Sequence, residues 1–505
     1  MPALIRVLLV ATALAGVCIP ARVCAQASPY IPLDDPRLPL LEHLISRGEV
    51  DDPSPMVRPF RRSDAVRVLA AADTSAASPS AGLIRRLRSE FDDPPGNYWR
   101  LEGRAGGQAY THGRRDLLHP AGARRIRPFA ELSGSAVFGN VVLATRPMAE
   151  PGLLDDPDWG GRTDLKFTAR IADAYVSAQF KYGSLFYGQV DRNWGPVGLP
   201  GIPLSNYAYE HQGLALEVGN QDLRLSAFAT DLQDATDTLG RTVHRYYFVH
   251  RLHARPSRRL TLGVWEGVVL AGADRNFETR YRNPLSISYL ANTIGLGDRG
   301  NVILGTDVHW RAFRRATLEA QLAIDDFSYQ NRSGPNRVPD RWALTLAAFG
   351  PFRSAWSWRA FYTRATSLAF RTFNPFENFT DNGVGLGRNF ADMDQLTASL
   401  AVPVAGRWLV SPDLTVLRQG EGAIDAPFPL SPVELSQTPL MFIGVVEKTF
   451  RLGLGVSGRQ GPLDLTANAG LHHIVNWQHV AGQTANRFEG RIQVTLGLGR
   501  VGTLQ

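Results

Sequence analysis

The sequence predicts a mainly β protein: a transmembrane antiparallel β-barrel of about 18 strands with a small N-terminal periplasmic α-helical domain. A period-two alternation of apolar and polar residues runs from Tyr98 to the end of the chain. Short and long connections between the expected strands follow one another in turn. After residue 25 no run of 18 or more apolar residues occurs, so a protein of this kind that crosses a membrane must cross it with strands.

Residues 1–25 have the composition of a signal peptide, with Arg6, then the apolar run Val7 to Val17, then a small-residue site ending at Ala25. The only two cysteines lie in this segment, which excludes a disulfide framework, a thiol catalyst and a cysteine metal site in the mature chain. The formal charge of +7 falls to 7 − 2 = +5 when Arg6 and Arg22 are removed. We do not expect a nucleic-acid partner, because the chain is exported.

Residues 26–96 show helical periodicity and are expected to form the periplasmic helical domain. The first helix follows Asp35, has Pro36 at its first position and ends before Gly48. A second short helix follows Ser63 and a third follows Ser78. Each is short and apolar on one side only, so we expect the helices to pack together or against the barrel.

Residues 97–505 are expected to form the barrel. Between 396 and 402 apolar side chains occupy one face and polar side chains the other, and the same pattern recurs between 463 and 472. Such alternation is typical of strands between lipid and a polar lumen, although a soluble sandwich would show it too.

The connection lengths favour the barrel over the sandwich. Outer-membrane barrels have short periplasmic turns and longer outer loops, with an even number of strands. Both ends of the barrel segment then lie on the periplasmic side, with the helices. Short turns are expected near 181–183, 219–221, 255–258, 313–315, 350–353, 405–406 and 459–462, and long connections near 111–123, 145–162, 191–212, 231–241, 271–301, 327–340, 366–393, 418–438 and 476–487.

The stretch Tyr187 to Pro196 carries the most informative local pattern. It begins as a strand and ends in Trp-Gly-Pro, where Pro196 stops regular pairing because it has no N–H. A Trp beside an Arg and an Asp at a strand end suits a sugar, since the ring stacks on apolar sugar faces and the charged groups bond hydroxyls or uronic acids. The alternative is an aromatic girdle residue at a strand end.

This stretch, with Gly-Gln-Val followed by Trp-Gly-Pro and a Gly-rich loop, resembles the capsule assembly protein Wzi family. His43 to Leu69 and Arg280-Tyr281-Arg282-Asn283-Pro284 are similar to two further parts of that family. The resemblance implies an outer-membrane barrel of a Gram-negative-type bacterium, with periplasmic helices, that holds capsular polysaccharide on the cell surface. Its implied partners are capsular or extracellular polysaccharide, outer-membrane lipid and polysaccharide export machinery.

The candidate polysaccharide-binding residues lie in the long connections. Arginine forms forked bonds to carboxylates of acidic polysaccharides, and aromatic rings stack on sugars. The alternative for each arginine is a salt bridge in the lumen or at the rim, and for Asn283-Pro284 it is a turn. The candidates are Trp159, Asp191, Arg192, Trp194, Arg280, Tyr281, Asn283 and Tyr289.

The sequence does not favour an enzyme, a cofactor or a metal site. His472 and His473 are adjacent in an expected strand and point to opposite faces, and no Gly-x-Ser-x-Gly, HExxH or phosphate-binding loop occurs. The function inferred mainly from the resemblance is that of a non-enzymatic, lectin-like protein that attaches or organises capsular or extracellular polysaccharide. A porin or sugar-conducting channel is the first alternative, unless loops such as 271–301, 366–393 and 418–438 fill the lumen. An outer-membrane hydrolase is the second.

Overall fold

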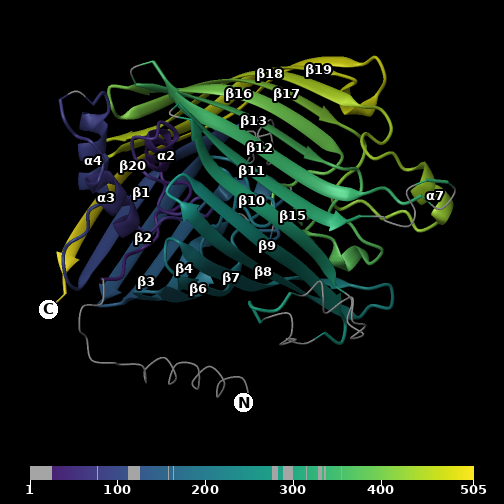
Figure 1. Ribbon diagram of the computed structural model, residues 1–505, viewed down its shortest axis with the longest axis horizontal. Helices are drawn as coiled ribbons and strands as arrows, with labels where there is room; N and C mark the ends of the chain where they lie inside the picture. Colours follow the sequence, from purple (N-terminus) through teal and green to yellow (C-terminus); the bar gives the residue numbers. More distant parts are fainter. Residues whose placement is uncertain are drawn as a thin grey trace.

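The protein is a closed β-barrel with a group of short helices at one end (Figure 1). The computed structural model describes residues 26–504 apart from 77, 112–125, 157, 163, 166, 276–282, 288–299, 314, 328–332, 335–336 and 354. The expected signal peptide, 1–25, lies outside the described residues.

The three helices expected near the N-terminus are present as α2 (Leu38–Ser46), α3 (Arg62–Ala70) and α4 (Ala81–Phe91). Their apolar faces are fully buried, as Leu41, Leu69 and Leu87 show. The helices share one hydrophobic cluster with Phe349 and Leu409 of the barrel wall, so burial against the barrel stabilises segments too short to persist alone. No helix in the described part of the chain is long and apolar enough to cross a membrane.

The barrel is one sheet of 18 strands, as the sequence predicts. The strands are β1 (Tyr98–Tyr110), β2 (Ile126–Phe138), β3 (Val141–Ala149), β4 (Ala169–Phe180), β5 (Gly183–Gln189), β6 (Gln212–Gly219), β7 (Leu223–Thr236), β8 (Thr242–Ser257), β9 (Leu260–Gly272), β10 (Asn301–Phe313), β11 (Ala316–Asp326), β12 (Arg341–Phe352), β13 (Trp356–Ala365), β16 (Met393–Val404), β17 (Trp408–Gln419), β18 (Glu447–Gln460), β19 (Leu463–Val475) and β20 (Thr484–Thr503).

Short elements occupy the long connections. They are η1 (Pro151–Asp155), η2 (Pro375–Glu377), β14 (Thr380–Asp381), β15 (Val384–Gly385), α7 (Pro432–Gln437) and η3 (Trp477–His479). Successive wall strands pair antiparallel, and β20 pairs with β1 from Thr503 opposite Tyr98 to Arg491 opposite Tyr110. This pairing closes the sheet and leaves the barrel no exposed edge.

The wall has an apolar outer face and a polar inner face. On β18, Phe450, Leu452 and Leu454 are 45–58% exposed, whereas Thr449 and Arg451, which alternate with them along the strand, are buried. In a soluble sandwich the apolar face would be the buried one. The exposed apolar face is therefore that of a transmembrane barrel, which resolves the ambiguity in the alternation pattern.

The short turns and the long connections lie at opposite ends of the barrel, and the helices α2–α4 lie at the short-turn end (Figure 1). Several polar contacts join the helical segment to different parts of the wall, and three of them show the range. Arg61 pairs with Glu217 on β6 at 3.0 Å, His43 Nδ1 lies 2.8 Å from Ser357 Oγ on β13, and Arg311 on β10 pairs with Asp51 at 2.7 Å.

The loop 190–211 folds into the lumen and crosses it from β5 to β11. The side chain of Glu319 accepts from the N–H of Val197 at 2.8 Å, and Gln321 accepts from Ile202 at 2.7 Å while donating to the carbonyl of Trp194 at 2.9 Å. The sequence predicted this loop as a surface connection. Instead it forms a transverse plug, because wall residues on the opposite side supply its backbone hydrogen bonds.

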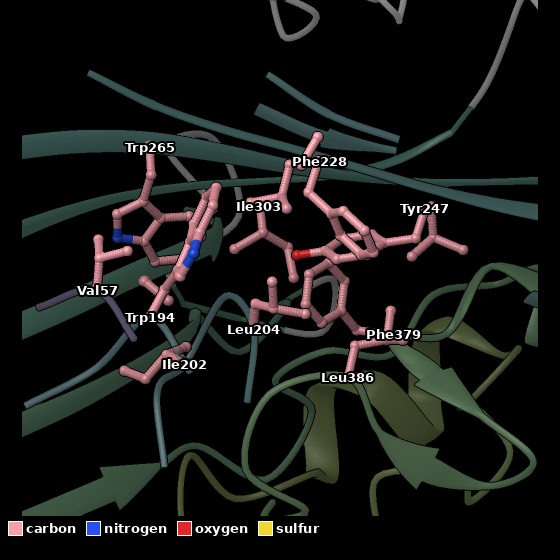
Figure 2. Packing of buried hydrophobic residues seen from close by; sticks show 14 of the residues in the cluster. Val57, Trp194, Ile202, Leu204, Phe228, Tyr247, Trp265, Ile303, Phe379 and Leu386 are labelled. Carbon is pink, nitrogen blue, oxygen red and sulfur yellow. The ribbon is translucent and has the colours of Figure 1, made fainter. Parts of the chain in front are cut away.

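The loop 366–392 packs against this plug inside the lumen. From the sequence, the connection 366–393 is one of those that could fill the lumen. A Cβ added at Gly387 would lie 1.9 Å from the carbonyl oxygen of Ile202, so only glycine lets the two loops meet. Figure 2 shows the hydrophobic cluster that results, in which Trp194, Leu204, Phe379 and Leu386 of the loops pack against Tyr247 and other wall residues. The middle of the lumen is a packed core.

Candidate functional site

A cavity of about 380 Å³ lies in the lumen on the long-loop side of the plug. Its wall residues belong to β1, β2, β3, β4, β13, β19 and β20. The loops 150–156, 190–211 and 366–392, together with Asp34, supply the other lining residues. The volume falls in the range of small-ligand pockets. We name this space the lumenal cavity.

Arg170 of β4 is held on one side of the cavity by two acids. Its Nε lies 3.1 Å from Glu150, its Nη1 pairs with Glu210, and its guanidinium carbon lies 5.5 Å from the centroid of the Tyr209 ring. Because both acids and the ring constrain it, Arg170 presents a fixed planar edge.

Tyr209 is the aromatic centre of the site. Its hydroxyl donates to Asp156 at 2.5 Å, and Trp159 packs edge-on against its ring with centroids 4.7 Å apart. Tyr110 and Tyr207 also line the cavity. The three tyrosines offer flat faces and hydroxyls together, which is the combination that sugar rings need.

Four other cavity residues have side chains that bond to no other side chain or backbone group in the described part of the chain. They are Asp191, Asn206, Arg491 and Gln493, of which Asn206 and Arg491 are exposed and the other two half-buried. Burial raises the pKa of Asp191 to about 7, with Asp34 and Asp173 adding to the shift and Arg170 opposing it. The cavity therefore combines an arginine, two amides and a carboxyl group that is half protonated near neutral pH.

This arrangement can bind a polyhydroxylated ligand. A carboxyl group and amides bond to hydroxyls, Arg491 can meet a carboxylate or a hydroxyl, and the tyrosines supply apolar faces. Among the residues described, no three His, Asp or Glu side chains are placed to hold a metal ion.

The structure brings two of the predicted site residues to the cavity: Asp191 lines it and Trp159 supports Tyr209. Arg192 lies behind, with its guanidinium 4.4 Å from the centroid of Phe186 and 5.1 Å from that of Phe228. Trp194 is only 3% exposed and packs in the plug.

The remaining predicted residues lie in the connection between β9 and β10. Asn283 accepts from the N–H of Leu285 at 3.1 Å and from that of Ser286 at 2.9 Å, which makes the turn expected at Asn283-Pro284. Arg280, Tyr281 and Tyr289 lie outside the described residues.

Sequence reasoning did not select Arg170, Tyr209 or Arg491. Arg170 and Arg491 are single polar residues in alternating strands, and many lumen-facing positions carry such residues. Tyr209 had a usable signal, because Tyr-Ala-Tyr-Glu-His-Gln closes the Gly/Pro-rich loop just before the next strand. Aromatics at that junction face the site.

Comparison with solved structures identifies the architecture. Over 93% of this chain and 99% of the other, the fold matches that of Wzi, described as an outer-membrane protein involved in group 1 capsule assembly in Escherichia coli and as a carbohydrate-binding β-barrel, with a TM-score of 0.63 and 13% sequence identity. The chain has the Wzi fold. The fold expected from the sequence resemblance to the Wzi family is thereby confirmed.

Weaker similarities extend to other barrels. OprD of Pseudomonas aeruginosa matches over 81% of this chain and 96% of its own, with a TM-score of 0.43 and 11% identity. OccAB4 of Acinetobacter baumannii matches over 80% and 98%, with a TM-score of 0.44 and 9% identity. No protein-family model and no curated protein sequence matches the chain.

Proposed function

We propose that this protein is a non-enzymatic, lectin-like barrel of the outer membrane that attaches capsular or extracellular polysaccharide at the cell surface. In the orientation that we propose, the long connections face the exterior and the short turns and α2–α4 face the periplasm, as is general for outer-membrane barrels. The lumenal cavity then opens toward the exterior, where an exported polymer is found.

The lumenal cavity is the observation that carries this proposal. It combines Tyr110, Tyr207 and Tyr209 with hydrogen-bonding groups that lack partners, above a packed plug. Side chains that line a cavity and bond to no neighbour in the protein can exchange their bonds to water for bonds to the hydroxyls of a ligand. The similarity to a barrel described as carbohydrate-binding supports the same ligand class.

A polymer would be held by repeated weak contacts. A cavity of about 380 Å³ admits a short part of a chain, so one barrel binds weakly. Many barrels in one membrane bind the same polymer, and multivalency then raises the total affinity without any tight single site.

A solute channel is the alternative, because an 18-stranded barrel is wide enough for an aqueous pore. The hydrophobic cluster that spans the lumen from Trp194 to Phe379 weighs against it. Single-channel recordings in planar bilayers distinguish the two functions. The lectin proposal expects no steady conductance from the purified protein, and a large open current would favour the channel.

The direct test compares cell-bound and released polysaccharide in a strain that lacks the gene and in its parent. Loss of attachment should release polymer into the medium without changing the total amount. Complementation with Tyr209→Ala should restore attachment only in part. The matched control is Tyr182→Ala, which removes an exposed tyrosine at a short turn and should restore attachment fully. Unchanged attachment in the deletion strain would refute the proposal.

A further inference from the structure

A row of charged side chains crosses the outer wall at the long-loop end. The strand register places Arg364 of β13 opposite Asp394 of β16, Asp394 opposite Arg418 of β17, and Arg418 opposite Lys448 of β18. Asp394, Arg418 and Lys448 lie an even number of residues from the exposed Leu396, Leu414 and Phe450 on the same strands and therefore share their outward face. Arg364 shares it too, because it is paired opposite Asp394. We name these four residues the cationic row.

The row has a net charge of +2, from three cations and one acid. Arg418 binds Asp394 through both ends of its guanidinium, at 2.9 and 2.5 Å, yet its side chain remains 48% exposed. Arg364 lies 5.6 Å from the ring centroid of Trp342, and Lys448 is exposed. No carboxylate in the described part of the chain pairs with Arg364 or Lys448.

An apolar groove of about 820 Å³ begins directly below the row. Leu396, Val416 and Phe450 lie two residues from Asp394, Arg418 and Lys448 on the same strands, and Leu452 and Leu471 continue the groove toward the middle of the wall. Leu452 and Leu471 are 58% and 61% exposed. The groove suits acyl chains, and the row lies where the headgroup of the same lipid would be.

We propose that this part of the wall binds one phosphate-bearing lipid of the leaflet at the long-loop end. Arginine and lysine beside an apolar groove are complementary to an anionic headgroup above acyl chains. Adjacent strands lie about 4.8 Å apart, so Arg364 and Lys448 are separated by about 14 Å across the wall and can engage a headgroup with two phosphates. The inference requires a membrane location but not a polysaccharide ligand, so the two proposals fail independently.

A second apolar groove on the outer wall shows that the row is not a general feature of the barrel. This groove, of about 650 Å³, is lined by Leu143, Val176 and Tyr187 among others. Toward the long loops it is bordered by Gln189 at the end of β5 and Gln212 at the start of β6, which are uncharged. The cations are thus concentrated over one groove.

The test uses the purified full-length protein in non-ionic detergent and native mass spectrometry. The probe is hexa-acylated lipid A with two phosphates, and the same lipid with both phosphates removed is the comparison. Arg364→Gln combined with Lys448→Gln leaves the Arg418–Asp394 pair intact. Near a membrane surface each cation contributes about a fivefold factor, so the double variant should bind about 25-fold more weakly. Lys181→Gln, which removes an exposed lysine at a short turn, is the matched control and should bind normally.

The proposal expects one retained lipid in the wild type, weaker retention of the dephosphorylated lipid, and loss only in the double variant. Equal retention of both lipids would show that the groove binds acyl chains without a phosphate site. A loss of lipid binding in Lys181→Gln as large as that in the double variant would show that binding depends on net charge and not on the cationic row. Either result would overturn the proposal, and retained heat-modifiable migration in gels confirms that each variant is folded.

Discussion

The two halves of the lumen use the same residue types in different ways. In the half that contains the helices, Arg58 is 2% exposed, binds Asp52 at 3.0 Å and Glu42 at 3.2 Å, and lies 4.1 Å from the centroid of Phe60. In the half that opens to the long connections, Arg491 and Asp191 line a cavity and have no partner among the described residues. Arg58 thus uses its bonding capacity within the protein, whereas Arg491 and Asp191 keep bonding capacity for a ligand.

This difference shows how structural and binding arginines can be separated in a barrel lumen. Residue type does not separate them, since both halves are rich in arginine, aspartate and glutamate. The two kinds of arginine are separated by their pairing. A buried arginine whose hydrogen bonds all go to groups within the protein has no hydrogen-bonding capacity left for a ligand. Each prediction below tests one side of this comparison.

The largest effect is expected on the satisfied side. Arg58→Gln should lower the free energy of unfolding by about 3–5 kcal/mol, because Asp52 and Glu42 would remain buried without their cation. The backbone of Arg58 also pairs with Asn193 of the plug, at 2.8 Å from N–H to carbonyl. We therefore expect limited proteolysis to cut the helical segment and the plug together.

Arg67→Gln is the matched control for Arg58→Gln. Arg67 belongs to the same helical segment, but its side chain is 47% exposed and pairs with Asp64 on the helix surface. We expect the free energy of unfolding, measured in urea, to change by no more than about 0.5 kcal/mol. Similar losses of unfolding free energy in the two variants would mean that burial and pairing do not determine the contribution of an arginine at the helical end of the barrel.

The second prediction concerns Asp191 and pH. Its pKa of about 7 exceeds the ordinary value of 3.8, so the folded protein keeps a proton that the unfolded chain releases between pH 4 and 7. The stability contributed by this proton is fully present below about pH 4, falls as the pH rises to about 7, and is lost above it. The total change is up to about 4 kcal/mol, at 1.36 kcal/mol for each unit of pKa shift.

Asp191→Asn removes this dependence. Urea unfolding midpoints measured from pH 4 to pH 9 should fall more steeply for the wild type than for Asp191→Asn, and the two curves should run parallel above pH 7. If the two curves were instead parallel over the whole pH range, Asp191 would be hydrated like a surface carboxylate and its pKa would not be raised.

Much of the fold was predictable because it depends on regular patterns. Alternation and connection lengths predicted 18 strands, and apolar spacing predicted helices near Leu41, Leu69 and Leu87. The predicted ends of the strands were less accurate, because the alternation of apolar and polar residues in the sequence does not coincide with the residues at which backbone pairing begins and ends. The connection expected at 145–162 is occupied by β3 as far as Ala149, and β4 begins only at Ala169.

The site was less predictable because it depends on which loops turn inward. Trp194 in a Gly/Pro-rich loop has the composition of a surface sugar contact, and its burial follows from Gln321 and Glu319 on the far wall. Such partners lie more than a hundred residues away and carry no local signal. Asp191 was selected from the sequence and lines the cavity, whereas the selection of Arg491 required knowledge that β20 closes on β1.

The third prediction concerns the unsatisfied side and has the smallest expected effect. Arg491→Gln should weaken binding of polysaccharide purified from the parent strain by about 10- to 100-fold, since a hydrogen bond to a charged group contributes about 1.5–3 kcal/mol. Folding should be unaffected, because no partner in the described residues is left unpaired. Arg500→Gln on the outward face of the same strand is the control, and isothermal titration calorimetry is the measurement. If Arg491→Gln instead destabilised the barrel and left binding unchanged, Arg491 would belong with Arg58 among the structural arginines, and the contrast between the two halves would fail at this residue.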